Sequence, residues 1–214
     1  RENEAWLWVL VLVAFSIVKK NQLWFELAVD ASIVAKAWDY LSLRLPNAYS
    51  EYFNAALQNL NISKTFAMAI ARQESAWNPM AQSSANARGL MQLLPSTAKL
   101  TAENNQLPYQ GEQDLFKPLN NILLGTAHLN ELSGKYPNNR ILIAAAYNAG
   151  ANRVEKWLSR ASGKLALDEF VASIPFYETR GYVQNVVAYD FYYQILQNKE
   201  NPQIFSQEEL NRLY

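Results

Sequence analysis

The chain has 214 residues, of which half are apolar, and its 19 basic side chains balance 19 acidic ones. This length and composition predict a well-packed protein of one domain with an accessory segment, or of two small domains. The balanced charge and the lack of a basic recognition motif argue against a nucleic-acid-binding protein. There is no cysteine and only one histidine, His128, which excludes disulfides, thiol nucleophiles and histidine metal clusters, so we expect no metal ion.

The N-terminal part of the chain is predicted to be helical. An apolar run at 6–18 is followed by two lysines. The run is shorter than the roughly 17–25 apolar residues that span a bilayer, and it lacks the small-residue cleavage pattern of a signal peptide. We therefore expect two helical stretches within a helical array, at 5–18 and 22–43, that end near Pro46, and membrane association is not indicated.

The rest of the chain follows a helical period almost throughout. Proline and asparagine-rich segments divide it, and the stretches 78–94 and 103–116 are predicted to be loops. Helices are expected at 48–59, at about 63–76 with Ser63 as N-cap, at 95–102, from about 118 onward, and at 139–149, 151–160, 168–173, 177–198 and 206–213. The fold class is therefore predicted to be all-α.

The helix at 63–76 carries the candidate catalytic group, Glu74. Residues spaced to share one face of this helix are Phe66, Ile70, Glu74 and Trp77. A carboxylate on such a buried face is unusual, because burying an unpaired charge is costly, and the usual outcome is a raised pKa. A carboxylic acid that stays protonated near neutral pH can protonate the leaving oxygen of a glycoside.

The alternative interpretation of Glu74 is structural. Its carboxylate could form an ion pair with an arginine, and the candidates are Arg72, Arg88 and Arg180. The spacing alone does not decide between the two interpretations.

Three motifs follow one another along the chain: R-Q-E-S within 71–94, A-Y-N-A-G within 144–154 and Y-E-T-R-G-Y-V within 175–187. Their order and spacing resemble the soluble lytic transglycosylases of Gram-negative bacteria, in the lysozyme-like superfamily. The resemblance covers about 48–199, and 24–41 also resembles the helical linker before the catalytic domain of that family. It implies a linker at 1–47, ending a larger helical region, and a lysozyme-like catalytic domain at 48–214.

The resemblance also implies roles for single residues. Glu74 matches the sole catalytic acid/base of the family. The residues that match the lining of the glycan groove are Ser83, Gln92, Leu94, Tyr147, Asn148, Glu178 and Tyr182. Structural alternatives remain open, with Tyr147 as a core tyrosine, Gln92 as a loop brace and Glu178 as a partner of Arg180.

The activity implied by the resemblance is cleavage of peptidoglycan glycan strands in the periplasm, with any secretion signal upstream. Glu74 would act as acid and then as base on the β-1,4 bond between N-acetylmuramic acid and N-acetylglucosamine, giving a 1,6-anhydro product without a cofactor. A two-carboxylate hydrolase needs a second Asp or Glu near the first. No motif supplies one, although Glu178 could approach in the fold. A goose-type lysozyme-like hydrolase and a catalytically silent glycan-binding module remain as alternatives.

Three departures from the family pattern bear on the loops. Asn86 and Asn152 stand where the family has glycine, and asparagine tolerates positive φ better than other non-glycine residues, so we expect the backbone shape to survive. Arg88 adds a cation that could contact a substrate carboxylate or remain solvated. Lys117 replaces an acidic residue at a loop–helix junction.

Overall fold

The structure is a computed structural model that describes residues 25–214, so the helix expected at 5–18 lies outside the described part. Within 25–214 the chain forms eleven α-helices and one 3-10 helix, with two isolated β-bridges and no strand. No helix in this range is long and apolar enough to cross a membrane. The predicted all-α class is confirmed.

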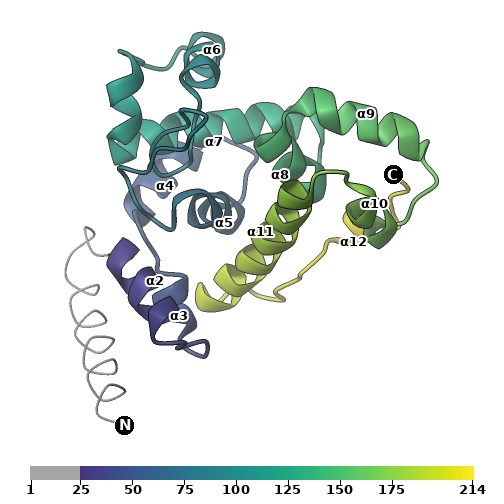
Figure 1. The fold of residues 1–214 in the computed structure, drawn as a ribbon, viewed down its shortest axis with the longest axis horizontal. Coiled ribbons are helices and arrows are strands. Elements are labelled where there is room, and N and C mark those ends of the chain that lie inside the picture. Colours follow the sequence, from purple (N-terminus) through teal and green to yellow (C-terminus); the bar gives the residue numbers. More distant parts are fainter. Residues whose placement is uncertain (1–24) are drawn as a thin grey trace.

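The helices appear in Figure 1 with the labels used below. They are α2 (Phe25–Val34), α3 (Leu41–Arg44), α4 (Ser50–Leu57), α5 (Lys64–Ser75), α6 (Pro95–Asn105), α7 (Pro118–Lys135), α8 (Arg140–Ala149), α9 (Ala151–Ala161), α10 (Leu167–Ser173), α11 (Tyr177–Leu196) and α12 (Gln207–Asn211), with the 3-10 helix η2 at Glu112–Phe116.

Helix α5 lies at the centre of the fold, between α4 and α11 (Figure 1). Ser63 is its N-cap, as predicted, and its hydroxyl accepts a hydrogen bond from the backbone N–H of Phe66 over 3.3 Å. Every residue from 65 to 72 is buried, in a core shared with side chains of α7, α8 and α11. A helix buried all round is fixed by partners on all sides. Any group at the end of α5 is therefore held on a rigid support.

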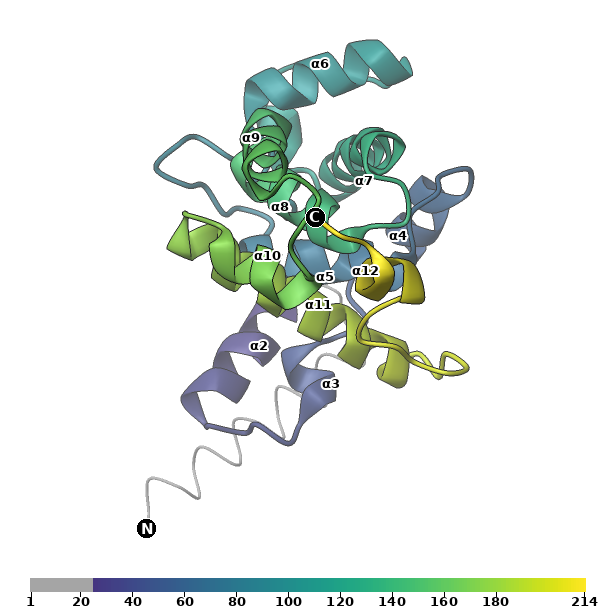
Figure 2. The same cartoon turned by 90° about the vertical axis from the view of Figure 1, so that its right-hand side faces the viewer.

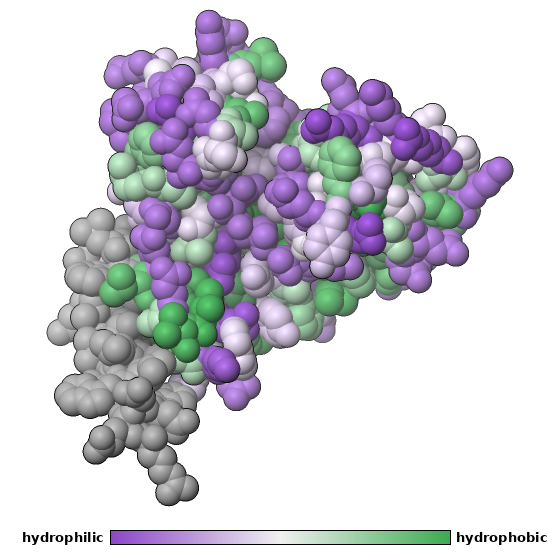
Figure 3. Space-filling view, in the orientation of Figure 1, coloured by the Kyte–Doolittle hydropathy of each residue, from purple (hydrophilic) through white to green (hydrophobic). Residues whose placement is uncertain are grey.

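The segment before the central helices differs from the sequence prediction. The expected continuous helix at 22–43 is wrong, because α2 ends at Val34 and a turn with Lys36 at φ 51° precedes α3. Helix α2 nevertheless packs onto the body, since the ring of Phe25 lies edge-on to that of Tyr49 at 5.7 Å, and α3 contacts α11. Figure 3 shows apolar side chains gathered on the α2–α3 side of the molecule. The domain boundary at 47/48 stays a prediction.

The C-terminal segment folds back onto the body, and Figure 2 shows the chain end beside α8 and α10. Tyr214 pairs with Leu165 through two backbone hydrogen bonds, and its ring stacks on that of Phe170 at 4.7 Å. Arg140 at the start of α8 pairs with Asp190 of α11 and Glu209 of α12. These contacts fix α10, α11 and α12 around one end of α8.

Three local expectations about the loops have different outcomes. Asn86 does adopt positive φ, at 68°. Asn152 does not, because α9 already begins at Ala151 and the left-handed position is taken by Gly150 at φ 88°. The loop predicted at 103–116 also contains helical structure, since α6 runs on to Asn105 and η2 occupies its second half.

Candidate active site

Glu74 is the last but one residue of α5, where the central helix reaches the surface. Tyr182, buried on α11, donates its hydroxyl to Oε1 of Glu74 over 2.6 Å. This contact joins two of the three sequence motifs at one carboxyl group.

The pKa of Glu74 is raised from its ordinary value of 4.5 to about 7. Loss of hydration on burial is the main cause, and the charge of nearby Glu178 adds to it. The hydrogen bond from Tyr182 acts in the opposite direction, because it favours the ionised carboxylate. Glu74 is therefore about half protonated at neutral pH.

No ion pair neutralises Glu74 within the described residues. Arg72 donates its Nε to the carbonyl oxygen of Arg44 over 2.7 Å and lies over the ring of Tyr189. Arg180 makes no salt bridge in the described part, so Glu178 is not its partner either. The structural interpretation of Glu74 as half of an ion pair finds no support.

The C-terminal end of α8 brings two further candidates to the same place. Tyr147 donates its hydroxyl to the carbonyl oxygen of Met91 over 2.7 Å, and burial together with the charge of Glu74 raises its pKa. Asn148 accepts a hydrogen bond from the Thr179 hydroxyl over 2.7 Å. Thr179, which the sequence interpretation missed, thus ties α8 to the first turn of α11 beside Glu178.

The loop at 78–94 holds the remaining candidates, and its polar side chains mainly brace the loop itself. The Gln92 amide nitrogen donates to the carbonyl oxygens of Ala81 and Gly89, at 3.0 and 2.9 Å. The Ser83 hydroxyl accepts from the backbone N–H of Ala87 over 3.1 Å. Leu94 is exposed just before α6. None of Ser83, Gln92 and Leu94 makes a hydrogen bond to Glu74 within 25–214.

Arg88 is buried in this loop and is held by protein partners. Its Nε and Nη2 donate to Oδ1 of Asn86 over 3.1 and 3.0 Å, and Nη2 also pairs with Glu112. The guanidinium lies over the ring of Phe116 at 5.4 Å. Of the two possibilities left open by the sequence, the solvated arginine is not found, because the side chain fastens the loop to η2.

Asn121 is a second residue that the sequence interpretation missed. It is fully buried on α7, accepts from the N–H of Met91 over 2.7 Å, and donates to the carbonyl oxygens of Arg88 and Leu115 at 2.9 and 2.8 Å. The available signal was an amide on the apolar face of a helix, where a buried polar group needs partners. Through Met91, Asn121 supports the loop on which Tyr147 rests.

The described residues show no group of three His, Asp or Glu side chains placed to hold a metal ion. The chemistry available to the site is that of one carboxyl group of raised pKa, flanked by two tyrosines and a second, exposed carboxylate. That set suits proton transfer.

Comparison with known proteins assigns the chain to a family. Residues 51–169 match the model described as the transglycosylase SLT domain, and 173–202 match the soluble lytic transglycosylase helical domain. This chain belongs to the transglycosylase SLT family.

Two proteins are similar to this chain over most of its length. A Haemophilus influenzae protein, provisionally named a soluble lytic murein transglycosylase, is 98% identical over 91% of the chain, which covers 33% of that protein. The soluble lytic murein transglycosylase of Salmonella typhimurium is 46% identical over 91% of the chain, covering 30% of its own length. The chain thus spans about a third of the length of these SLT-family relatives.

Solved structures of the family share the fold. The 70 kDa soluble lytic transglycosylase of Escherichia coli superposes with a TM-score of 0.90 at 43% identity, over 96% of this chain and 32% of that one. An inactive glutamate-to-glutamine mutant of a Pseudomonas aeruginosa lytic transglycosylase superposes with a TM-score of 0.84 at 36% identity, over 95% and 32%. The lysozyme-like transglycosylase fold expected from the motifs is confirmed.

Proposed function

We propose that the chain is the catalytic part of a periplasmic lytic transglycosylase that cuts peptidoglycan glycan strands. The observation that carries the proposal is the Glu74 carboxyl group, with a pKa raised to about 7 and no ion-pair partner within the described residues. A group of that pKa both gives and takes a proton near neutral pH. A glutamate-to-glutamine mutant of the Pseudomonas aeruginosa relative is described as inactive, which supports the assignment.

In the first step Glu74 donates its proton to the glycosidic oxygen between N-acetylmuramic acid and N-acetylglucosamine. The bond from C1 to that oxygen breaks, and positive charge develops at C1. The glutamate is left as a carboxylate in a partly desolvated site, where the Tyr182 hydroxyl stabilises it through its hydrogen bond of 2.6 Å.

In the second step the Glu74 carboxylate takes the proton of the C6 hydroxyl of the same muramic acid. The C6 oxygen then bonds to C1 and closes the 1,6-anhydro ring, and Glu74 returns to its protonated form. No water, metal ion or cofactor is consumed. One carboxyl group is sufficient because the substrate supplies its own nucleophile.

The other candidates are proposed to shape the groove around this carboxyl. Tyr147 and Asn148 form the wall on the α8 side, and Glu178 closes the site from α11. Ser83, Gln92 and Leu94, on the loop at 78–94 that precedes α6, would line the glycan groove around it. The division into a linker at 1–47 and a catalytic domain at 48–214 belongs to the same proposal.

A lysozyme-like hydrolase is the second candidate, and the proximity of Glu178 favours it. The charge of Glu178 adds, after burial, to the raised pKa of Glu74, which indicates a second carboxylate near the first. If Glu178 activated a water molecule, the product would carry an ordinary reducing end instead of the anhydro ring.

Mass spectrometry of fragments released from purified sacculi tests both candidates. Anhydro ends, lighter by one water than reducing ends, are the expected result, and products with only reducing ends would establish hydrolysis instead. Glu74→Gln should release nothing while keeping the fold, and Glu51→Gln, an exposed change on α4, serves as the matched control. Release of fragments by Glu74→Gln would contradict the assigned acid. Sacculus binding without fragments from the unmodified chain would indicate a silent binding module.

A further inference from the structure

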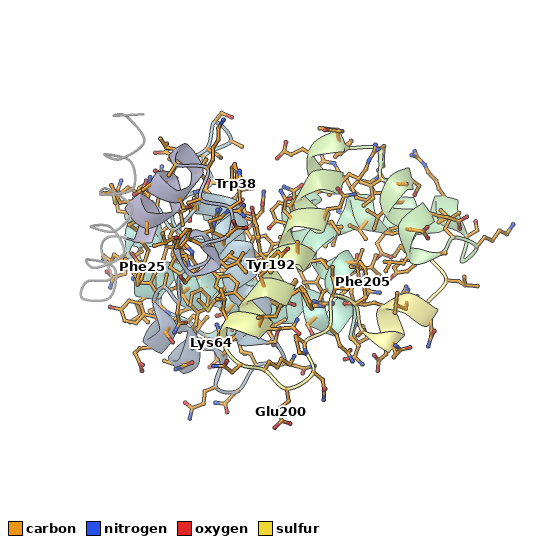
Figure 4. All side chains as sticks on the ribbon, turned by 90° about the horizontal axis from the view of Figure 1, so that it is seen from below. Phe25, Trp38, Lys64, Tyr192, Glu200 and Phe205 are labelled. Atoms are coloured by element: carbon orange, nitrogen blue, oxygen red, sulfur yellow. The ribbon has the colours of Figure 1, made fainter. Side chains whose placement is uncertain are left out.

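A large pocket lies on the other side of α11 from Glu74. It measures about 680 Å³, and its walls come from α8, α10, α11 and the segment at 204–210 that folds back over them. Figure 4 labels Phe205, one of its lining residues, on the segment that leads from α11 to α12. While Tyr182 points to the Glu74 carboxyl, its neighbours Val183 and Gln184 line this pocket. The pocket is therefore separate from the proposed catalytic site, and its volume is that of a small-molecule site.

Arg180 is the basic residue among the lining side chains of this pocket. Its Nε atom is buried without a hydrogen-bond partner, and the side chain forms no ion pair within the described part of the chain. A buried donor on a charged group is costly to leave unpaired. An anion in the pocket would satisfy this guanidinium, which binds a carboxylate through two parallel hydrogen bonds.

The other residues that line the pocket indicate the chemistry of the uncharged part of the ligand. They are mainly aliphatic and aromatic, with Val171, Val187 and Phe205 among them, and the polar residues besides Arg180 are Gln184 and Asp168. A peptide would bring an N–H and a C=O group with every residue, and these would lack partners here. A hydrocarbon chain needs no hydrogen-bond partner and suits these walls.

We propose that this pocket binds an aliphatic monocarboxylate, with the carboxylate on Arg180 and the chain between α10 and α11. One guanidinium matches one negative charge. Asp168, exposed on α10, also lines the pocket and opposes an anion weakly through solvent. A ligand with two or more negative charges is therefore disfavoured.

Calorimetric titration of the whole chain with short fatty acids tests this site. Across butanoate, hexanoate and octanoate, each added methylene should tighten Kd about fourfold, the effect of burying one such group. Octanol, equal in length but uncharged, should bind at least tenfold more weakly than octanoate. Equal affinity for octanol and octanoate, or no gain with chain length, would overturn the proposal.

Three variants and one control locate the site. Arg180→Gln should weaken octanoate binding about tenfold or more, whereas Arg160→Gln, an exposed change on α9, should leave it unchanged. Ala172→Phe places a ring in the pocket from an exposed lining position and should abolish binding even if Arg180→Gln does not fold. Asp168→Asn should tighten binding about twofold.

Octanoate binding that survives both Arg180→Gln and Ala172→Phe would show that the ligand sits elsewhere. Glu74→Gln should bind octanoate with unchanged affinity. The pocket proposal and the proposed lytic activity can therefore fail independently.

Discussion

Tyr182 and Glu74 are 108 residues apart in the sequence, yet the tyrosine hydroxyl donates to the glutamate carboxylate over 2.6 Å. The contact joins α11 to α5, the two helices that pack against each other most extensively among the described elements. The pKa of Glu74 on α5 thus depends partly on α11, a helix far away in the sequence. Tyr182 and Glu178 both act on the Glu74 carboxyl group, so replacing either one should move the pKa of Glu74 in a defined direction.

Tyr182→Phe removes one hydrogen bond and keeps the ring in its packed position. Because that hydrogen bond lowers the pKa of Glu74, its loss should raise the pKa further above 7. The alkaline limb of the pH profile of kcat/KM should shift to higher pH, since Glu74 stays protonated longer. Sacculus turnover measured between pH 5 and 9 provides the profile. A shift to lower pH would contradict the role given to this hydroxyl.

Glu178→Gln should have the opposite effect. The charge of Glu178 raises the pKa of Glu74, so its neutralisation should lower that pKa and move the alkaline limb to lower pH. Turnover at pH 5.5 should persist, because the transglycosylase mechanism needs no second carboxylate. Complete loss of turnover at all pH values would favour Glu178 as the general base of a hydrolase.

The site was predictable from the sequence where it depends on local spacing. The 4, 4, 3 spacing of Phe66, Ile70, Glu74 and Trp77 placed Glu74 on the buried face of a helix, and Ser63 marked where that helix begins. Phe66 and Ile70 are indeed buried on this helix. Trp77 is buried as well, but it lies beyond the end of α5 at Ser75, with φ 73°. Helix periodicity and capping act within a few residues, so one sequence suffices to detect them.

What was not predictable depends on tertiary approach. The turn at Lys36 interrupts a stretch without glycine or proline, so no breaker residue marked it. The role of Arg88 required knowing that η2 brings Glu112 to the loop. Asn121 likewise acts on a loop some 30 positions earlier in the chain. Such partners are set by the packing of α7 against the loop, which no local pattern encodes.

Gly89 tests the loop that Asn121 supports. Its φ is 75°, and a Cβ atom added there would collide with the Leu115 carbonyl oxygen and the Asn121 side chain. Gly89→Ala should therefore lower the free energy of unfolding by about 2 kcal/mol or more, from backbone strain and the displaced Asn121 together. Chemical denaturation measures this change, and sacculus turnover should fall with it.

The matched control is Gly134→Ala, near the end of α7. Apart from its chain neighbours and the backbone of its own helix, a Cβ atom at Gly134 meets no atom within 4 Å. Alanine should raise the free energy of unfolding there by about 0.5–1 kcal/mol, because glycine is the poorer helix former. Equal effects of the two substitutions would show that the Gly89 environment is not as tight as described.

The raised pKa of Glu74 also predicts how stability depends on pH. The folded state holds the proton up to about pH 7, whereas the unfolded chain releases it near 4.5. Between these values folding is linked to proton uptake, so the stability present below pH 4.5 is lost as the pH rises through 7. Glu74→Gln has no proton to lose. The free energy of unfolding of this variant should equal that of the unmodified protein at pH 4.5 and exceed it at pH 8.5 by roughly 1–3 kcal/mol. Access of solvent to the carboxyl group reduces the difference toward the lower value. Thermal unfolding at the two pH values measures this. A constant difference across the range would mean that Glu74 is not desolvated, and the acid of the proposed mechanism would lose its physical basis.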